Sequence, residues 1–194
     1  MMSFTFVKEA LKKFKTQGSL FPSTSALSKW MLKPVKMVPG VVIVELGAGT
    51  GIFTKEIIAR LPKESKLVVF ENNTALARLL RDELRASVDK GRVVLIEDDA
   101  VNFPEHLNRL NIPKAHYVIS GLPLANFDHK LRQKLFNAIN AGMTDDGVYV
   151  QFQYLLASWS HVRKEFDAKI IGFEVRNLPP AFIYSCRKRL SKDQ

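Results

Sequence analysis

The pattern of apolar and polar residues divides this chain into two alternating kinds of segment. Short apolar runs, typical of buried parallel strands, are separated by longer stretches in which apolar residues recur at helical spacing. The expected strands are 41–45, 67–71, 93–97, 116–120, 147–154, 168–175 and 181–186, and the expected helices are 3–15, 24–32, 52–60, 74–88, 105–110, 130–141 and 159–165. This alternation predicts an α/β fold with a parallel sheet, whose last two strands form a hairpin across 177–180 and add an antiparallel edge.

The length and composition indicate one compact domain, 37–194, preceded by amphipathic helices in 1–36. The chain has 194 residues, of which 46% are hydrophobic and 25% charged, as in ordinary globular proteins. No apolar run approaches the roughly 20 residues of a membrane-spanning helix, and no signal peptide is visible. The single cysteine, Cys186, allows no internal disulfide and fits a reducing compartment, so we expect a cytoplasmic protein. No Cys/His cluster has metal-ligand spacing, so no metal is expected.

A glycine-rich loop, VELGAGTGIFTKEI, follows the first expected strand and precedes a helix. Gly47, Gly49 and Gly51 alternate with other residues, and Glu45 stands at the strand end. The dinucleotide fingerprint G-x-G-x-x-G fails because Ile52 occupies its third glycine position. Glycines permit a sharp turn and a close approach of ligand to backbone, and a helix N-terminus attracts anions. The loop therefore predicts a ligand site, against the alternative of a glycine-rich turn that binds nothing.

Acidic residues end the next two expected strands. Glu71 lies 20 positions beyond Gly51, the distance at which related folds place a carboxylate on ribose hydroxyls. Asp98 and Asp99 end the third strand. In open α/β sheets ligands bind at the carboxyl ends of the strands, so the three strand ends predict one shared site. A solvated carboxylate at a strand end is the alternative for each residue taken alone.

The spacing E-x-G-x-G-x-G resembles motif I of the class I S-adenosylmethionine-dependent methyltransferases. The resemblance implies their seven-stranded Rossmann-like sheet with helices on both faces, and S-adenosylmethionine as the cofactor. In that family an acidic residue after the third strand binds the adenine amino group, a role that falls here to Asp99. The cofactor-binding residues it implies are Glu45, Gly47, Gly49, Gly51, Glu71, Asn72, Asp98, Asp99, Ala100 and Ser120.

The segment after the fourth strand, SGLPLANF, bears on the methyl acceptor. The ribosomal RNA adenine dimethylases carry N-L-P-Y here, with an Asn and an aromatic ring that hold the flipped base. In this chain Gly121 stands in the Asn position and Leu124 in the aromatic position. Gly offers no side-chain acceptor and Leu is a poor stacking platform, so both positions count against a nucleobase.

The same segment is similar to that of the soluble bacterial phospholipid N-methyltransferases, which methylate phosphatidylethanolamine. The match extends through GSLFPSTSALSKWM, SGLPLANF, QFQY and NLPPAFIY, and so spans nearly the whole chain. It implies methyl transfer to the amine of phosphatidylethanolamine. The catalytic positions that we derive for this reaction are Ser120, Gly121, Leu122, Pro123 and Tyr154. Phe21, Phe127 and Tyr184 are candidates for an aromatic cage, and His161 for a phosphate contact. The alternatives are an RNA adenine N6-methyltransferase and a non-catalytic cofactor-binding scaffold.

The distribution of charge along the chain favours an anionic membrane surface as a partner. The net charge is +10, and the first 40 residues hold seven lysines against one glutamate. In the expected helix 3–15 the lysines flank an apolar face, which is typical of a helix that lies on an anionic membrane surface. A helix packed on the domain is the alternative, and RNA binding would use the same charge. We expect peripheral association with the inner membrane and no obligate protein partner, with nucleic acid the less favoured partner.

Overall fold

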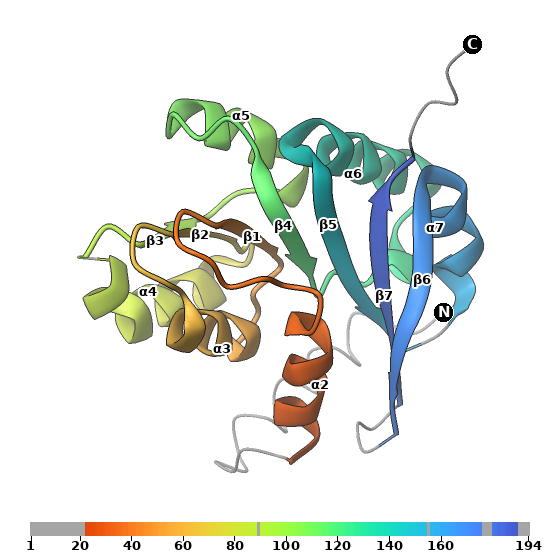
Figure 1. The fold of residues 1–194 in the computed structure, drawn as a ribbon, viewed down its shortest axis with the longest axis horizontal. Coiled ribbons are helices and arrows are strands. Elements are labelled where there is room, and N and C mark those ends of the chain that lie inside the picture. The colour runs from red at the N-terminus through yellow and green to blue at the C-terminus, as the bar shows by residue number, and fades with distance from the viewer. Residues whose placement is uncertain (1–21, 89, 155, 176–179, 190–194) are drawn as a thin grey trace.

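The computed structural model describes residues 22–88, 90–154, 156–175 and 180–189 (Figure 1). Its helices are α2 (Pro22–Leu32), α3 (Ile52–Arg60), α4 (Thr74–Val88), α5 (Phe103–Arg109), α6 (His129–Gly142) and α7 (Trp159–Glu165). Its strands are β1 (Val42–Leu46), β2 (Lys66–Phe70), β3 (Val93–Ile96), β4 (Ala115–Ser120), β5 (Met143–Gln153), β6 (Phe166–Glu174) and β7 (Ala181–Lys188). Short 3₁₀ turns are η1 (Ala100–Asn102), η2 (Leu124–Asn126) and η3 (Leu156–Ser158). The expected helix 3–15 lies outside the described residues.

The strands form one seven-stranded sheet in the order β3-β2-β1-β4-β5-β7-β6. The pairs from β3 to β5 are parallel, whereas β7 is antiparallel to both of its neighbours. This confirms the predicted Rossmann-like fold with an antiparallel edge. Two strands begin earlier than predicted. β5 starts directly after α6, at Met143, and β6 starts at Phe166, which is buried against Phe136 and Tyr149.

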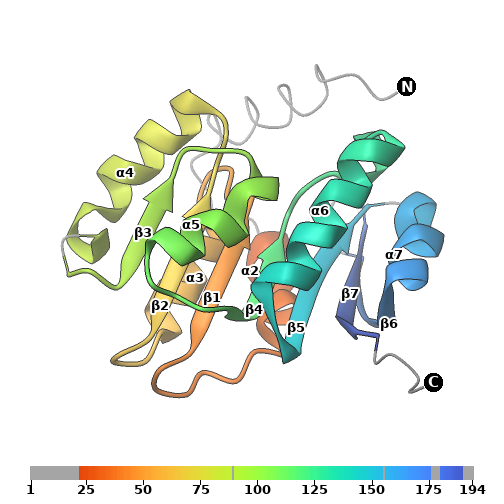
Figure 2. The same cartoon turned by 90° about the horizontal axis from the view of Figure 1, so that it is seen from above.

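Two apolar cores lie on opposite faces of the sheet. Phe103 of α5, Phe136 of α6 and Val162 of α7 pack on one face. Met31 of α2, Ile57 of α3 and Leu80 of α4 pack on the other, so each helix buries one apolar stripe. Figure 2 shows α5 and α6 in front of the sheet, with α2 and α3 behind it. In the described part of the chain, none of the helices combines the length and apolarity needed to cross a bilayer.

The strand order reverses at β1, which pairs with β2 on one side and β4 on the other. Chain connections leave β1 and β4 in opposite directions at this point, and in open α/β sheets the ligand-binding crevice lies outside the carboxyl ends of the strands at such a point. The glycine loop follows β1 and the SGLP segment follows β4, so the fold brings the two predicted motifs to one edge. The Gly121 amide donates a hydrogen bond to the Leu46 carbonyl at 3.2 Å, which joins the two segments directly.

Candidate functional site

The glycine loop is tied to the neighbouring strand by its own backbone. The amides of Gly47 and Ala48 both donate to the Phe70 carbonyl, at 2.9 and 3.2 Å. Gly47 has φ +74° and Gly49 has φ +59°, a left-handed conformation that strains any residue with a side chain. A Cβ on Gly47 would collide with the Leu122 side chain, whereas a Cβ on Gly49 would meet nothing within 4 Å. The Leu122 side chain therefore fills the space beside Gly47, whereas the space beside Gly49 is free of protein atoms.

The Glu71 carboxylate braces this open part of the loop. The Gly49 amide donates to one Glu71 oxygen at 2.7 Å, and the Asn73 amide donates to the other at 2.9 Å. Glu71 is buried, while the neighbouring Asn72 is exposed. The sequence distance between the glycines and Glu71 thus corresponds to a direct contact between two strand ends.

Glu45 is a buried carboxylate at the end of β1. Neither of its side-chain oxygens has a hydrogen-bond partner within the described residues. Burial raises the pKa of Glu45 to about 7; nearby Thr54 acts to lower this pKa, and the charge of Glu71 adds to the rise. An isolated buried carboxylate is costly unless a cation compensates it. Together with the open cradle at Gly49, this orphaned carboxylate fits a ligand that carries both an anionic and a cationic group, such as the amino acid end of S-adenosylmethionine.

The two aspartates after β3 have different environments. Asp98 accepts hydrogen bonds from the Asp99 amide and the Asn102 side chain, and it pairs with His106 Nε2 at 2.7 Å. The hydrogen bond with His106 is the main reason that the pKa of Asp98 is lowered. Asp99 is exposed, and its carboxylate accepts a hydrogen bond from the Val101 amide. The carboxylate therefore keeps acceptor capacity toward solvent. Asp98 stabilises the turn, and Asp99 is the better placed of the two to meet a ligand.

The segment after β4 is held from below by two glutamine side chains. The Leu122 carbonyl accepts hydrogen bonds from Gln151 Nε2 at 3.1 Å and Gln153 Nε2 at 2.8 Å. The Leu122 amide donates to the buried Ser120 hydroxyl at 3.2 Å. A carbonyl oxygen has two lone pairs, so both acceptor sites of Leu122 are used within the protein. The Leu122 carbonyl is therefore occupied by protein partners in this structure.

A buried tyrosine orients the first of these glutamines, Gln151. The Tyr149 hydroxyl donates to Gln151 Oε1 at 2.6 Å, which fixes the amide so that its nitrogen faces Leu122. Burial raises the pKa of Tyr149 well above its ordinary value, so the hydroxyl stays protonated and remains a donor. The chain Tyr149–Gln151–Leu122 gives the loop a defined shape before any ligand binds.

An aromatic ring lies close to Gly121, against the position that a side chain there would take. A Cβ on Gly121 would lie 3.3 Å from Phe152 Cε1 and 3.4 Å from the Gly47 carbonyl oxygen. Phe152 continues a row of edge-to-face rings, with centroids 5.6 Å from Phe53 and 5.5 Å from Tyr154. The row runs from the first turn of α3, beside the glycine loop, to the exposed end of β5. The site is walled by aromatic rings where an amide side chain would otherwise stand.

The predicted aromatic residues divide into three groups. Tyr154 is exposed just beyond β5 and reaches the row through Phe152, so it stays a candidate. Tyr184 was wrong as a cage residue, because it is fully buried with its ring 4.8 Å from Trp159. Phe127 is half-buried against the core, and Phe21 lies outside the described residues. His161 is half-buried and remains a candidate for a phosphate contact.

The motif QFQY was matched in the sequence without a role for its first three residues, which shape the acceptor side. Gln151, Phe152 and Gln153 form the end of β5, where successive side chains point to opposite faces. The two glutamines therefore share the face toward Leu122, and Phe152 takes the face toward Gly121. A strand that carries amides on one face and aromatic rings on the other at its carboxyl end is the signal that could have identified them.

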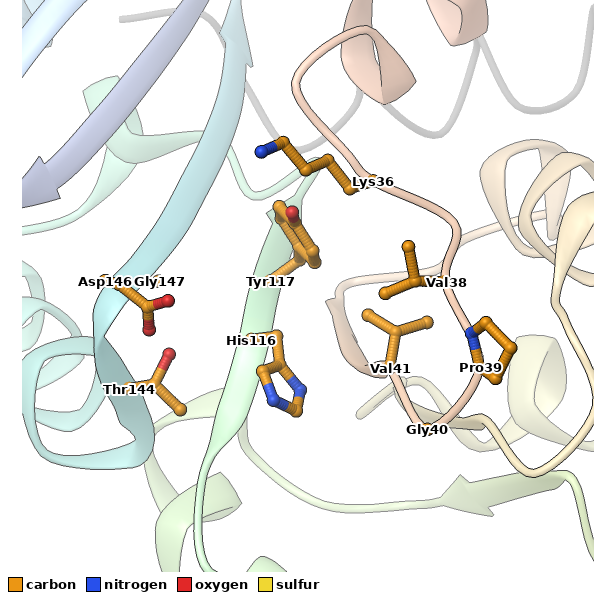
Figure 3. Close-up of a pocket in the computed structure, with 10 residues that line it drawn as sticks. All are labelled: Lys36, Val38, Pro39, Gly40, Val41, His116, Tyr117, Thr144, Asp146 and Gly147. Atoms are coloured by element: carbon orange, nitrogen blue, oxygen red, sulfur yellow. The ribbon is translucent and has the colours of Figure 1, made fainter.

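A separate cavity lies at the opposite edge of the sheet. Figure 3 shows it between the segment before β1 and the starts of β4 and β5, with Val38, His116 and Asp146 among its lining residues. His116 Nδ1 accepts a hydrogen bond from the Val42 amide at 3.0 Å. Because it lies at the amino ends of the strands, this cavity is distinct from the crevice formed by the motifs. In the ranges that the structure describes, no group of three His, Cys, Asp or Glu side chains is arranged to hold a metal ion.

Comparison with known proteins places these features among the methyltransferases. The profile of the ribosomal RNA adenine dimethylase family matches residues 12–157. An ornithine lipid N-methyltransferase of Singulisphaera acidiphila is 33% identical over 189 residues, which cover 95% of each chain. A ribosomal RNA small subunit methyltransferase A of Thermotoga petrophila is 28% identical over 116 residues, which cover 60% of this chain but 40% of that protein.

Solved structures share the fold at low sequence identity. A methyltransferase of Aquifex aeolicus, described as S-adenosylmethionine-dependent, superposes with a TM-score of 0.65 at 8% identity, over 93% of this chain and 98% of that one. A precorrin-6y C5,15-methyltransferase of Geobacter metallireducens gives 0.64 at 16% identity, over 84% and 87% of the two chains. These likenesses extend the fold assignment and leave the acceptor to be argued from the site.

Proposed function

The chain belongs to the ribosomal RNA adenine dimethylase family of S-adenosylmethionine-dependent methyltransferases, and we propose that it methylates the primary amine of a membrane lipid. Phosphatidylethanolamine is the acceptor that its motifs favour. An ornithine lipid is the second candidate, because the relative that covers nearly the full chain is named for that substrate. Methylation of an adenine in RNA is the alternative function.

The observation that carries the proposal is the ring of Phe152 against Gly121. A nucleobase amine needs an amide acceptor at this position and a flat ring on which the base can stack. Here the acceptor is absent, the ring of Phe152 lies close to its position, and the Leu122 carbonyl already accepts two hydrogen bonds. A lipid amine needs neither feature. Its trimethylated product is a permanent cation, and aromatic faces stabilise methylated ammonium groups.

The cofactor is S-adenosylmethionine, and we assign its contacts to the residues at the carboxyl edge. Glu45 would attract the ammonium group of the cofactor, and the space in front of Gly49, whose amide already donates to Glu71, would let the cofactor approach the backbone closely. Glu71 would bind the ribose hydroxyls, with Asn72 beside it, and Asp99 with Ala100 would hold the adenine. Gly47 and Gly51 shape the turn, Ser120 supports the acceptor loop, and Asp98 orders the turn next to Asp99.

The chain's own task in the reaction is to position a neutral amine. When bound, S-adenosylmethionine would supply an electrophilic methyl group, whose bond to sulfur would break as S-adenosylhomocysteine leaves. The amine must offer a free lone pair to take that methyl group, so the extra proton of its ammonium form has to be lost first. The loop Ser120–Pro123 and the ring of Phe152 restrict the approach of the amine, and Tyr154 places a hydroxyl at the exposed end of the ring row. Positioning of the two reactants would account for much of the rate.

A methyl-transfer assay with labelled cofactor can distinguish the three candidate acceptors. The full-length protein is incubated with methyl-labelled S-adenosylmethionine and either phosphatidylethanolamine vesicles, ornithine lipid vesicles or ribosomal RNA. The proposal expects label in a lipid product, with phosphatidylethanolamine the better acceptor. Label in RNA alone would overturn it, whereas label in ornithine lipid alone would keep lipid methylation and replace the acceptor. We place the reaction at the cytoplasmic surface of the inner membrane, with residues 1–36 acting as the helical cover or anchor.

A further inference from the structure

A group of exposed apolar residues lies at the carboxyl edge of the sheet, outside the ring row. Leu156, Phe173 and Val175 are large apolar residues with exposed side chains, and the ring of Phe173 stacks on Phe182 with centroids 4.6 Å apart. We call these four residues the apolar rim. They come from the end of β6, the start of β7 and the turn after β5, so they are distant in sequence and gathered by the fold.

The register of the sheet shows that the rim adjoins the acceptor side of the site. Phe182 pairs with Phe173 on β6 and with Gln153 on β5, so the three residues form one rung across the end of the sheet. Gln153 is also the residue whose amide holds the Leu122 carbonyl. The rim therefore begins one strand away from the loop where the acceptor amine would enter.

Exposed lysines lie on α2, which packs on the opposite face of β6 from the rings of Phe173 and Phe182. This helix packs on β6 through Trp30, since a Cβ on Gly172 would collide with the Trp30 ring. Lys29 and Lys33 are exposed on the same helix, and Lys33 Nζ lies 4.6 Å from the centre of the Trp30 ring. Figure 1 shows α2 and the connected ends of β6 and β7 extending toward the same side of the molecule.

We propose that the apolar rim inserts into the interfacial region of an anionic phospholipid bilayer, with the α2 lysines against the headgroups. This inference rests on the proposed lipid acceptor, because docking at this edge would turn the site opening toward the amines of the bilayer. Apolar side chains contribute through burial, and lysines through attraction to anionic lipids. A rim with half-exposed rings at the end of the sheet, with cationic side chains on the helix behind β6, has the chemistry of such a surface, and it acts in addition to any contact made by residues 1–21.

Vesicle sedimentation of the full-length protein tests the proposal. The vesicles contain phosphatidylglycerol and phosphatidylcholine, which offer no acceptor amine. The double variant Phe173→Ser, Val175→Ser should bind about tenfold more weakly than the parent, because two apolar side chains no longer leave water. Val38→Ser is the matched control: Val38 is 53% exposed at the opposite edge of the sheet, and its loss should leave binding unchanged. Equal binding by the double variant and the parent would overturn the proposal.

A fluorescent probe gives a second measurement that does not depend on losing a contact. An environment-sensitive dye is attached at Val175→Cys or Val38→Cys; the native Cys186 is buried and should not react. The dye at position 175 should shift to the blue on vesicles and the dye at position 38 should not. No shift at 175, or equal shifts at both positions, would contradict docking by the rim. A blue shift at 175 in a protein that methylates no lipid would support docking and overturn the proposed function instead.

Discussion

Lowering the pH from 8 to 6 should weaken the binding of S-adenosylhomocysteine, because it neutralises Glu45. This carboxylate is buried, its pKa is raised to about 7, and we assign it to the ammonium group of the ligand. The sign follows from the raised pKa: the free protein carries the charged form above pH 7 and the neutral form below it. The ammonium and carboxylate of the ligand keep their charges across this range, so the change in affinity belongs to the protein.

The expected magnitude follows from the ionised fraction of Glu45. With a pKa of about 7, roughly nine-tenths of the carboxylate is charged at pH 8 and roughly one-tenth at pH 6. If only the charged form binds well, the apparent dissociation constant rises as that fraction falls, by about tenfold over the two pH units. Binding at pH 6 should also release close to one proton per ligand, because the ligand favours the charged carboxylate.

Isothermal titration calorimetry in two buffers with different ionisation enthalpies measures both quantities. Glu45→Gln is the control, since the amide keeps the shape and cannot titrate. This variant should bind weakly at both pH values and release no proton. Affinity of the parent that stays constant from pH 8 to pH 6, or an identical pH slope in Glu45→Gln, would refute the assignment of Glu45 to the ammonium group.

Three further substitutions test the rest of the site. Gly49→Val should abolish measurable S-adenosylhomocysteine binding, whereas Gly40→Val, at another left-handed glycine with open space in front of it, should cost similar thermal stability and leave binding intact; equal binding by the two would remove Gly49 from the cofactor site. Tyr154→Phe keeps the ring beside Phe152 and loses the hydroxyl, so lipid methylation should fall by about 10²-fold with unchanged cofactor affinity if the hydroxyl orients or deprotonates the amine; full activity would exclude that role. Phe152→Leu should reduce the yield of the trimethylated lipid more than that of the monomethylated one, because only the later products are permanent cations, and an unaltered product ratio by thin-layer chromatography would argue against a ring–cation contact.

The sequence was sufficient for the sheet and for the motifs that meet at its carboxyl edge, and insufficient for the contacts on the acceptor side. Motif spacing predicted that Glu71 would meet the glycine loop, and its carboxylate does bind the Gly49 amide. This works because parallel strands place their carboxyl ends at one edge, so position in sequence determines position in space. Contacts between side chains of two neighbouring strands cannot be predicted in this way. The contact between Phe152 and Gly121 depends on the register between β4 and β5. That register shifts between Ala115 and Tyr117, which no local sequence pattern reveals.

Burial also separated residues that the sequence treated alike. Tyr154 and Tyr184 are both aromatic residues near a strand end, yet the first is 42% exposed and the second is fully buried. The difference arises because Tyr184 lies within β7, on the face that Trp159 covers, whereas Tyr154 follows the last residue of β5. The asymmetric roles of Asp98 and Asp99 likewise depend on His106, eight residues away from Asp98 on α5.

The contact between Gly121 and Phe152 also constrains how this branch of the family can diverge. An Asn introduced at position 121 would bring its first side-chain carbon to 3.3 Å from the ring, so the ring would have to move by a few tenths of an ångström. A smaller residue at position 152 would remove this contact. Substitutions at the two positions should therefore be non-additive, and an Asn at 121 should be accommodated more easily once residue 152 is small.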